Sequence, residues 1–288
     1  MDRKLLLGID FNNILFSSFY GESLINSKGQ NVNAIKGFFF RIKNLIETFN
    51  PDYLIMANDI GREKTFRRKL YKNYKSQRKP RNDDLIFQLQ QTLKLTSLLG
   101  YPIINNELYE ADDILGMVSK YTTEQDMDMI IISSDKDLYQ LVNENVFIFS
   151  PRNKELIDLD WLYNKYKLTP QRWIDFKILT GDSSDNIPGI GGIGEVTALK
   201  LLNQYKDIDD IYQNLNKIKP VLKDKFIQKE SFIPIIRELV TIIIDYNKIN
   251  FHPNMIERSE VFPNEIFQTI QELEIPSLHN IMKYNLIN

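Results

Sequence analysis

Acidic side chains follow four separate apolar runs of this chain, and each run has the length of a short strand. The runs cover residues 4–9, 53–57, 102–104 and 129–132. The acids that follow them are Asp10, Asp59, Glu110, Asp112, Asp113, Asp135 and Asp137. Helix capping could account for one or two of these positions, but acids after all four runs are hard to explain as capping. Carboxylate oxygens with no His or Cys nearby suit hard cations such as Mg²⁺ or Mn²⁺.

A glycine-rich stretch at residues 181–202 combines two more carboxylates with tight turns. It reads GDSSDNIPGIGGIGEVTALKLL and holds five of the twelve glycines of the chain. Asp182 and Asp185 precede the glycines, and a helix is predicted to begin before Ala198. One interpretation is a metal beside a phosphate held by backbone groups. The other is an Asx turn followed by a plain helical hairpin, and the stretch alone leaves both open.

Residues 61–81 carry ten Lys or Arg and one acid, Glu63, with Phe66, Tyr71 and Tyr74 interleaved. A charged run is often only a solvated helix face. The charge imbalance, the aromatic residues and the acids upstream favour phosphate binding and base stacking instead. Leu85, Leu89 and Leu93 form one stripe of a helix predicted over residues 82–99, so we expect residues 61–100 to form a helical arm.

Alternating apolar runs and helical stretches predict βαβ units and a mostly parallel sheet. A fifth strand is expected at residues 146–149, and helices at residues 35–49, 161–166, 172–179 and 232–244. Because the carboxyl ends of parallel strands share one edge, the acids should meet there. Residues 206–288 suggest no chemistry of their own.

The composition excludes several kinds of site. The 288 residues include no Cys, which removes disulfides and thiolate sites, and only His252 and His279, which argues against a His triad or a zinc site. The net charge is −2, with strong segregation along the chain. The first residues do not read as a signal peptide, and no apolar run reaches membrane-spanning length, so a cytoplasmic protein with no membrane association is expected.

In order, these motifs resemble the 5′-nuclease family, which comprises the 5′-nuclease domain of bacterial DNA polymerase I, free-standing phage 5′-exonucleases and flap endonucleases. The resemblance covers residues 5–202 and rests on TFRRKLYKNYKSQR, EADDILG, SSDKDLYQLV and the glycine-rich stretch. It implies a PIN-like α/β nuclease fold, a mostly parallel sheet flanked by helices, with a helical arch. The implied domains are a nuclease domain at 1–170 and a helical DNA-binding domain at 171–288, with a helix–three-turn–helix hairpin at 181–202.

The resemblance also assigns residues. The carboxylates of a first metal would be Asp10, Asp59, Glu110, Asp112 and Asp113, and those of a second metal Asp135, Asp137, Asp182 and Asp185. The catalytic basic residues would be Lys75, Arg78 and Arg67, with Tyr74 as a stacking candidate. The hairpin glycines would be Gly189, Gly191, Gly192 and Gly194, which in the family hold a monovalent cation, K⁺, against duplex DNA. Phe11 and Ser17 depart from the family, which often has a small residue and an arginine there, so a phosphate contact could be lost or supplied elsewhere.

The function implied is a structure-selective 5′-3′ exonuclease and flap endonuclease that uses two Mg²⁺ ions, with Mn²⁺ substituting, in primer or flap removal or repair. The expected partners are DNA with 5′ ends, flaps or branches, RNA–DNA primers and a replication polymerase, with the chain itself a monomer. Three alternatives remain: a ribonuclease acting on RNA primers, a non-catalytic DNA-binding protein on the same fold, and a compact toxin-type nuclease. The intact acid set argues against the second, and the length, arm and hairpin against the third. Individually, Asp112 could simply begin a helix and Asp137 could cap one.

Overall fold

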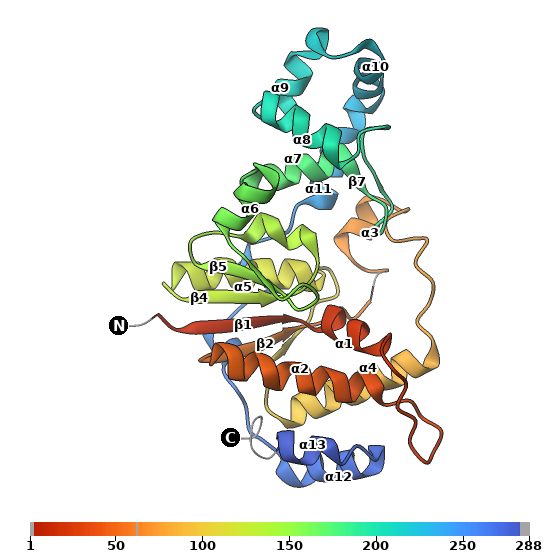
Figure 1. Cartoon of the computed structure of the whole chain (residues 1–288), viewed down its shortest axis with the longest axis vertical. Helices are drawn as coiled ribbons and strands as arrows, with labels where there is room; N and C mark the ends of the chain where they lie inside the picture. Colours follow the sequence, from red (N-terminus) through yellow and green to blue (C-terminus); the bar gives the residue numbers. More distant parts are fainter. Residues whose placement is uncertain (1–2, 62, 283–288) are drawn as a thin grey trace.

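A six-stranded sheet lies at the middle of the protein, seen here in a computed structural model that describes residues 3–61 and 63–282 (Figure 1). The strand order is β3-β2-β1-β4-β5-β6. Strands β1 to β5 are parallel, and β6 pairs antiparallel with β5. The strands are β1 Leu5–Asp10, β2 Tyr53–Ala57, β3 Ile103–Ile104, β4 Asp128–Ile132, β5 Val146–Ser150 and β6 Glu155–Ile157. The predicted mostly parallel α/β sheet is confirmed, and only the short strand β6 was not anticipated.

The strands are apolar on both sides because helices cover both faces of the sheet. Successive residues of β1 alternate between two cores, with Leu6 in one and Leu7 and Ile9 in the other. One face is covered by α1 Phe11–Phe19, α2 Asn33–Phe49 and α4 Asp83–Leu98. The other is covered by α5 Ala111–Glu124, the 3-10 helix η1 Lys136–Leu141 and α6 Leu159–Tyr166.

The core on the face covered by α5 and α6 continues into the next helices of the chain. These are α7 Pro170–Thr180, α8 Glu195–Gln204, α9 Ile208–Gln213, α10 Pro220–Lys229 and α11 Ile233–Val240. A two-stranded hairpin of β7 Gly181–Asp182 and β8 Ile187–Pro188 connects α7 to α8. The remaining 3-10 helices are η2 Leu215–Lys217, η3 Glu230–Phe232, η4 Tyr246–Ile249 and η5 Pro253–Ile256. Proline at the first turn of α7 and of α10 helps to begin both helices.

The end of the described chain returns to the opposite side of the molecule. Helices α12 Pro263–Leu273 and α13 Ser277–Ile281 pack against α4 and α2, at the far end from α10 (Figure 1). Ile266, Ile270 and Leu278 are buried in the same core as α2. The prediction of one helical domain over 171–288 is therefore wrong for residues 263–282. No helix was predicted individually at these residues, and the domain prediction placed them with their sequence neighbours.

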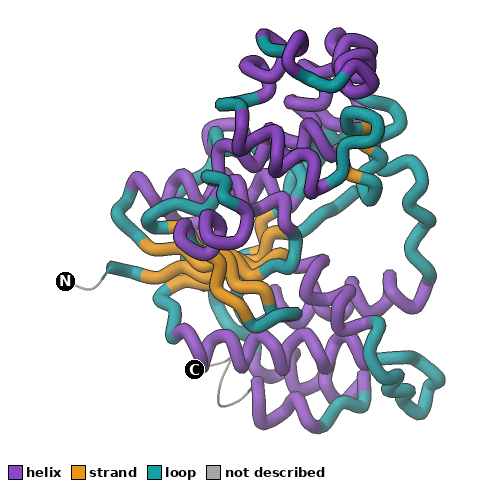
Figure 2. The backbone as a smooth tube through the Cα atoms, turned by 45° about the horizontal axis from the view of Figure 1, so that its top comes forward, coloured by secondary structure: helices purple, strands orange, loops and turns teal. Residues whose placement is uncertain are grey.

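The predicted helical arm is also wrong in its structure. Of residues 61 and 63–82, only α3 Phe66–Leu70 is helical, and residues 71–82 form turns and extended chain. Figure 2 shows this loop crossing from α3 to α4 at the side of the molecule. Helix α4 lies in the core instead of in an arm, because Leu89 and Leu95 are buried there. The positive charges of residues 71–82 thus lie on a loop, with Lys72, Arg78 and Lys79 among them, whereas those of residues 66–70 lie on α3.

None of the helices formed by residues 3–61 and 63–282 is both long enough and apolar enough to cross a membrane.

Candidate active site

Four carboxylates come together at the carboxyl edge of the sheet. Asp10 ends β1 and caps α1, accepting hydrogen bonds from Asn13 N at 3.1 Å and Ser133 Oγ at 2.8 Å. Asp59 follows β2 and accepts the Ala111 N–H of α5 at 2.7 Å. Asp112 lies in the first turn of α5, and Asp135 follows β4 and caps η1. We call Asp10, Asp59, Asp112 and Asp135 the four-acid cluster.

Burial and neighbouring carboxylates raise the pKa of two members of the four-acid cluster, Asp10 and Asp112. Burial, with the charges of Asp59 and Asp135, raises the pKa of Asp10 to about 7. Burial, followed by the charges of Asp135 and Asp10, holds the pKa of Asp112 well above its usual range. Within residues 3–61 and 63–282, no ion pair joins any of the four to a Lys or Arg. The charge of Lys75 offsets part of the repulsion at Asp112, and an added cation or protons would balance the remaining negative charge.

The four-acid cluster fits a hard divalent cation in its donor chemistry, because it offers carboxylate oxygens without basic partners. Among the described residues, no three or more His, Cys, Asp or Glu side chains are placed so that they could together hold a metal ion. Mg²⁺ does not need such a cage, since it usually keeps several waters and takes one or two protein carboxylates. An open, water-filled position is also what a substrate phosphate would need.

Without a cation, the protein should lose stability as the pH rises from 5 to 7. The pKa of Asp10 is about 7 in the folded protein and near its ordinary value of 3.8 in the unfolded chain, so the folded state binds more protons in this interval. In EDTA we expect this one group to lower the free energy of unfolding by about 1.4 kcal/mol per pH unit. Mg²⁺ should flatten the profile because it favours the ionised carboxylate.

Urea unfolding at pH 5, 6, 7 and 8, with EDTA and with Mg²⁺, measures this effect. Asp10→Asn is the matched control and should have a smaller slope in EDTA, because Asp112 and Asp137, whose pKa values are also raised, still take up protons in the folded state. A stability that stays level or rises from pH 5 to 7 in EDTA would contradict the placement of Asp10.

Arg67 and Asp113 form a buried structural pair, so two predicted roles are wrong. Arg67 binds Asp113 through two hydrogen bonds of 2.6 and 2.8 Å, and both side chains are almost fully buried. Arg67 also donates to the carbonyl oxygens of Leu239 and Thr241, at 2.8 and 3.0 Å. Asp113 is neither exposed nor free to bind a metal, and Arg67 cannot reach a phosphate. The pair ties α3 and α5 to the end of α11.

Tyr74 and Lys75 lie beneath the four-acid cluster, on Glu110 and Asp185. The hydroxyl of Tyr74 lies 2.6 Å from Glu110 and 3.1 Å from Asp185, and its ring is buried, so the predicted base stacking is wrong. Lys75 Nζ lies 2.7 Å from Glu110 and 3.5 Å from Asp185. Burial opposes ionisation of Glu110, but the charges of Lys75 and Arg67 outweigh it and lower its pKa. Glu110 is therefore an ionised support for Lys75 at this edge.

A network of hydrogen bonds joins residues 73–78 to residues 183–186. The Lys75 N–H donates to Asp185 O at 2.9 Å, and Gln77 Nε2 donates to Ser183 O at 2.8 Å. Asn186 Nδ2 donates to Asn73 O at 2.8 Å, and Arg78 Nη2 lies 2.5 Å from Asp185 Oδ1. The basic loop is thus fastened to the glycine-rich stretch, a connection between distant segments that nothing in the sequence indicated.

Asp137 and Asp182 share a cation that the sequence analysis missed. Lys177 Nζ, from α7, lies 2.5 Å from a carboxylate oxygen of each. Burial and the charge of Asp135 raise the pKa of Asp137 to about 7, although Lys177 lowers it. The only sequence signal was a lysine five residues before Asp182, which nothing distinguished from other helix lysines.

Gly181 and Gly189 hold the hairpin closed. Gly181 has φ 69° and ψ −170°, a conformation that is essentially restricted to glycine. A Cβ on Gly181 would lie 2.3 Å from Gly189 N, and one on Gly189 would lie 2.4 Å from Gly181 N. Gly189 thus has a structural reason to be glycine, and its predicted DNA-binding role stays a prediction. Gly191, Gly192 and Gly194 are exposed, as a nucleic-acid contact would require.

We expect Gly181→Ala to destabilise the protein by about 1–3 kcal/mol through its backbone conformation alone, with a further cost from the contact with Gly189. Gly194→Ala is the matched control, because Gly194 has an ordinary extended conformation and nothing lies within 4 Å of its Cβ position. It should cost less than about 1 kcal/mol. Urea unfolding compares the two, and equal losses would contradict the hairpin geometry.

The two departures from the family pattern have structural explanations. Phe11 is fully buried and packs on Phe38, with ring centroids 4.8 Å apart. Ser17 Oγ accepts a hydrogen bond of 2.6 Å from Arg41 Nη1 of α2. Burial lowers the pKa of Arg41, and no carboxylate of the described ranges pairs with it. A guanidinium is thus present beside position 17, delivered by another helix.

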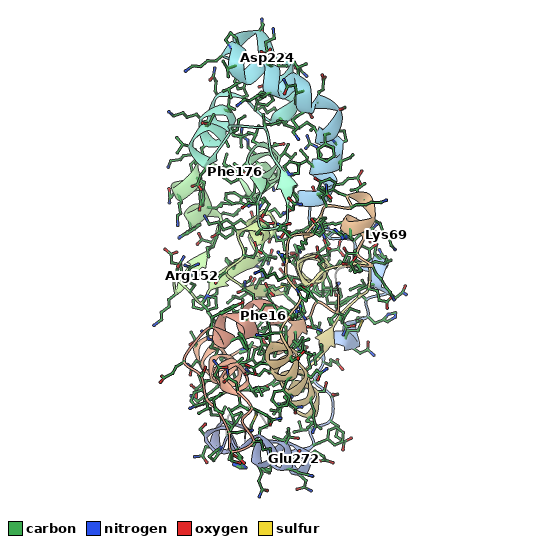
Figure 3. All side chains as sticks on the ribbon, turned by 90° about the vertical axis from the view of Figure 1, so that its right-hand side faces the viewer. Phe16, Lys69, Arg152, Phe176, Asp224 and Glu272 are labelled. Atoms are coloured by element: carbon green, nitrogen blue, oxygen red, sulfur yellow. The ribbon has the colours of Figure 1, made fainter. Side chains whose placement is uncertain are left out.

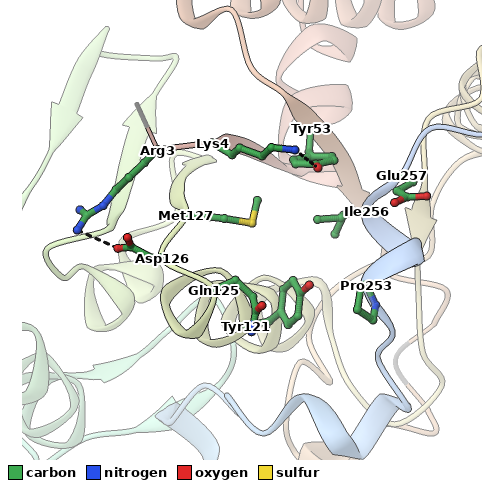
Figure 4. Close-up of a pocket in the computed structure, with 10 residues that line it drawn as sticks. All are labelled: Arg3, Lys4, Tyr53, Tyr121, Gln125, Asp126, Met127, Pro253, Ile256 and Glu257. Atoms are coloured by element: carbon green, nitrogen blue, oxygen red, sulfur yellow. Dashed lines mark hydrogen bonds and ion pairs between the residues drawn. The ribbon is translucent and has the colours of Figure 1, made fainter. Parts of the chain in front are cut away.

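A pocket of about 400 Å³ lies at the opposite edge of the sheet (Figure 4). Lys4, Tyr53 and Met127 line it, at the starts of β1, β2 and β4. It contains none of the predicted site residues, so we place the active site at the open carboxyl edge instead.

The fold combines a mostly parallel sheet, acids clustered at its carboxyl edge and a glycine hairpin between two helices. These features together define a 5′-nuclease. Residues 4–167 match the model of the 5′-3′ exonuclease N-terminal resolvase-like domain, and residues 168–263 match that of its C-terminal SAM fold. The chain belongs to the 5′-3′ exonuclease family. The predicted family and nuclease fold are confirmed.

The chain is similar to 5′-3′ exonucleases, to part of DNA polymerase I and, in its fold, to a flap endonuclease. The chain is 32% identical to the 5′-3′ exonuclease of Aquifex aeolicus over 277 residues, covering 96% of this chain and 94% of the other. It is 33% identical over 282 residues to DNA polymerase I of Caldicellulosiruptor bescii, and it spans about a third of that protein's length. A bacteriophage T5 flap endonuclease, crystallised in a complex with DNA and metal ions, shares the fold with a TM-score of 0.66 and 20% identity, over 94% of this chain and 100% of the other.

Proposed function

We propose that this protein hydrolyses phosphodiester bonds of DNA at 5′ ends and 5′ flaps, with a divalent cation bound at the four-acid cluster. The observation that carries the proposal is a group of neighbouring carboxylates that forms no ion pair with a Lys or Arg of the described ranges, placed beside a basic loop and an exposed glycine hairpin. A bound Mg²⁺ would supply an activated water and polarise a phosphoryl oxygen. Mn²⁺ has similar ligand preferences and should replace it.

The basic side chains would position the phosphate. Arg78 has 44% of its side chain exposed and can turn its guanidinium from Asp185 towards a phosphate. Lys75 is held by Glu110 and keeps a positive charge at the edge of the four-acid cluster. Arg41, beside Ser17, adds a guanidinium from α2. These three residues replace the predicted set of Lys75, Arg78 and Arg67.

The hairpin would bind duplex DNA at a fixed distance from the cluster. Gly191, Gly192 and Gly194 expose backbone groups at its tip. Lys225 of α10 brings an ammonium to the same turn, since its Nζ lies 2.5 Å from the position of a Cβ on Gly192. K⁺ at this turn, a monomeric state, a cytoplasmic location and a replication polymerase as partner stay predictions. Removal of primers or flaps would be the role, in line with the DNA polymerase I relatives.

Substrate comparison tests the proposal. We expect cleavage of a DNA duplex with a 5′ flap, little cleavage of the matched 3′ flap, and products that identify the junction as the cut site. The same duplex with an RNA flap tests the ribonuclease alternative. Preference for RNA would favour that alternative, and tight binding of both flaps without cleavage would favour a DNA-binding protein.

A further inference from the structure

The ammonium of Lys177 occupies the space between Asp137 and Asp182. It lies 2.5 Å from Asp137 Oδ1 and 2.5 Å from Asp182 Oδ2. The three residues come from η1, α7 and β7, and the side chain of Lys177 is 10% exposed. Both carboxylates belong to the predicted second metal site, so a protein cation stands where a second metal ion was expected.

The remaining oxygens of Asp182 and those of Asp185 are also engaged, whereas Asp135, the fourth acid predicted for the second metal, belongs to the four-acid cluster. Asp182 Oδ1 accepts from Ser184 N and Ser184 Oγ at 2.7 Å each, and from Asp185 N at 3.1 Å. Asp185 Oδ1 lies 2.5 Å from Arg78, and its Oδ2 faces Lys75 and the hydroxyl of Tyr74. A divalent ion would have to displace several charge-assisted hydrogen bonds to bind these carboxylates.

The four-acid cluster is different, although it lies on the same edge. Its carboxylates form no ion pair with a Lys or Arg of the described ranges, although the charge of Lys75 acts on Asp112. Coulomb energy therefore favours a divalent ion there, whereas Lys177 already compensates Asp137 and Asp182.

We propose that Lys177 is a built-in cation that replaces the second divalent ion, so that the protein binds one divalent ion tightly, at the four-acid cluster. The catalytic meaning of this inference rests on the proposed function, but the ion count does not. Lys177 is a positioning residue here: its single charge holds Asp137 and Asp182 in place and reduces the negative charge that an incoming phosphate meets. It supplies no activated water.

The test is the number of Mn²⁺ ions bound by the protein without DNA, measured by titration calorimetry and by electron paramagnetic resonance. We expect one tight ion for the unmodified protein. Lys177→Met removes the ammonium from a buried acidic pair and should bind two ions, whereas Lys177→Arg should still bind one. Two tight ions in the unmodified protein, or one in folded Lys177→Met, would overturn the inference.

A second pair of variants keeps the inference testable if Lys177→Met does not fold. Asp182→Asn should leave the affinity of the single tight Mn²⁺ within about threefold, and Asp112→Asn should weaken it at least about 100-fold. Loss of the tight ion in folded Asp182→Asn would overturn the inference. If the unmodified protein cleaved the 5′ flap and bound two tight ions, this inference alone would be refuted. If it bound one tight ion and did not cleave, the proposed function alone would be refuted.

Discussion

Asp112→Asn is expected to lower the rate of 5′-flap cleavage by at least about 1000-fold, with duplex affinity within about threefold of the unmodified protein. Asp112 faces the negative charges of Asp135, Asp10 and Asp59, which the positive charge of Lys75 offsets only in part, because the pKa of Asp112 stays well above its usual range. The amide keeps the shape of the side chain but removes a charge that a divalent ion requires. Single-turnover cleavage of a labelled flap gives the rate, and binding in Ca²⁺ gives the affinity.

Asp160→Asn is the matched control. Asp160 also lies in the first turn of a helix, but its side chain is exposed and it is not a member of the four-acid cluster. It should cleave at the unmodified rate. If Asp112→Asn kept more than about a tenth of the activity, the four-acid cluster would not be the catalytic centre.

Arg67→Met is expected to lower the free energy of unfolding by about 3–5 kcal/mol, the cost of leaving a buried carboxylate without its partner. Asp113 would lose two hydrogen bonds, and the carbonyls of Leu239 and Thr241 would each lose a donor. Urea unfolding monitored by circular dichroism measures the change.

Lys69→Met is the control for this substitution, since Lys69 lies at the exposed side of α3 (Figure 3). Its effect should be within about 0.5 kcal/mol. If Arg67 instead contacted a phosphate, as the resemblance implied, Arg67→Met would lower the rate of cleavage. Its free energy of unfolding would then equal that of Lys69→Met. That result would contradict the structural assignment.

The sequence was sufficient for the sheet and for the position of the acids. Buried parallel strands are short apolar runs, and all five predicted runs became strands of one sheet. Because such strands share a carboxyl edge, the sequence alone places Asp10, Asp59 and Asp135 together.

Individual side-chain roles could not be derived in the same way. Asp112 and Asp113 are neighbours, but a helix turns by about 100° per residue, so one faces the four-acid cluster and the other faces Arg67. The deciding partner, Arg67, is 46 residues away in sequence. Lys177 was missed for the same reason, since its two acids lie on different elements. Helices α12 and α13 were predicted to stay with their sequence neighbours, but their apolar faces pack on α2 and α4.

The most direct test of the account is cleavage of an internally labelled 5′-flap duplex in Mg²⁺ and in Ca²⁺, with product lengths resolved. We predict cutting at the flap junction in Mg²⁺ and binding without cutting in Ca²⁺. Equal cleavage in EDTA and in Mg²⁺, or binding without cleavage in Mg²⁺, would contradict a metal-dependent 5′-nuclease.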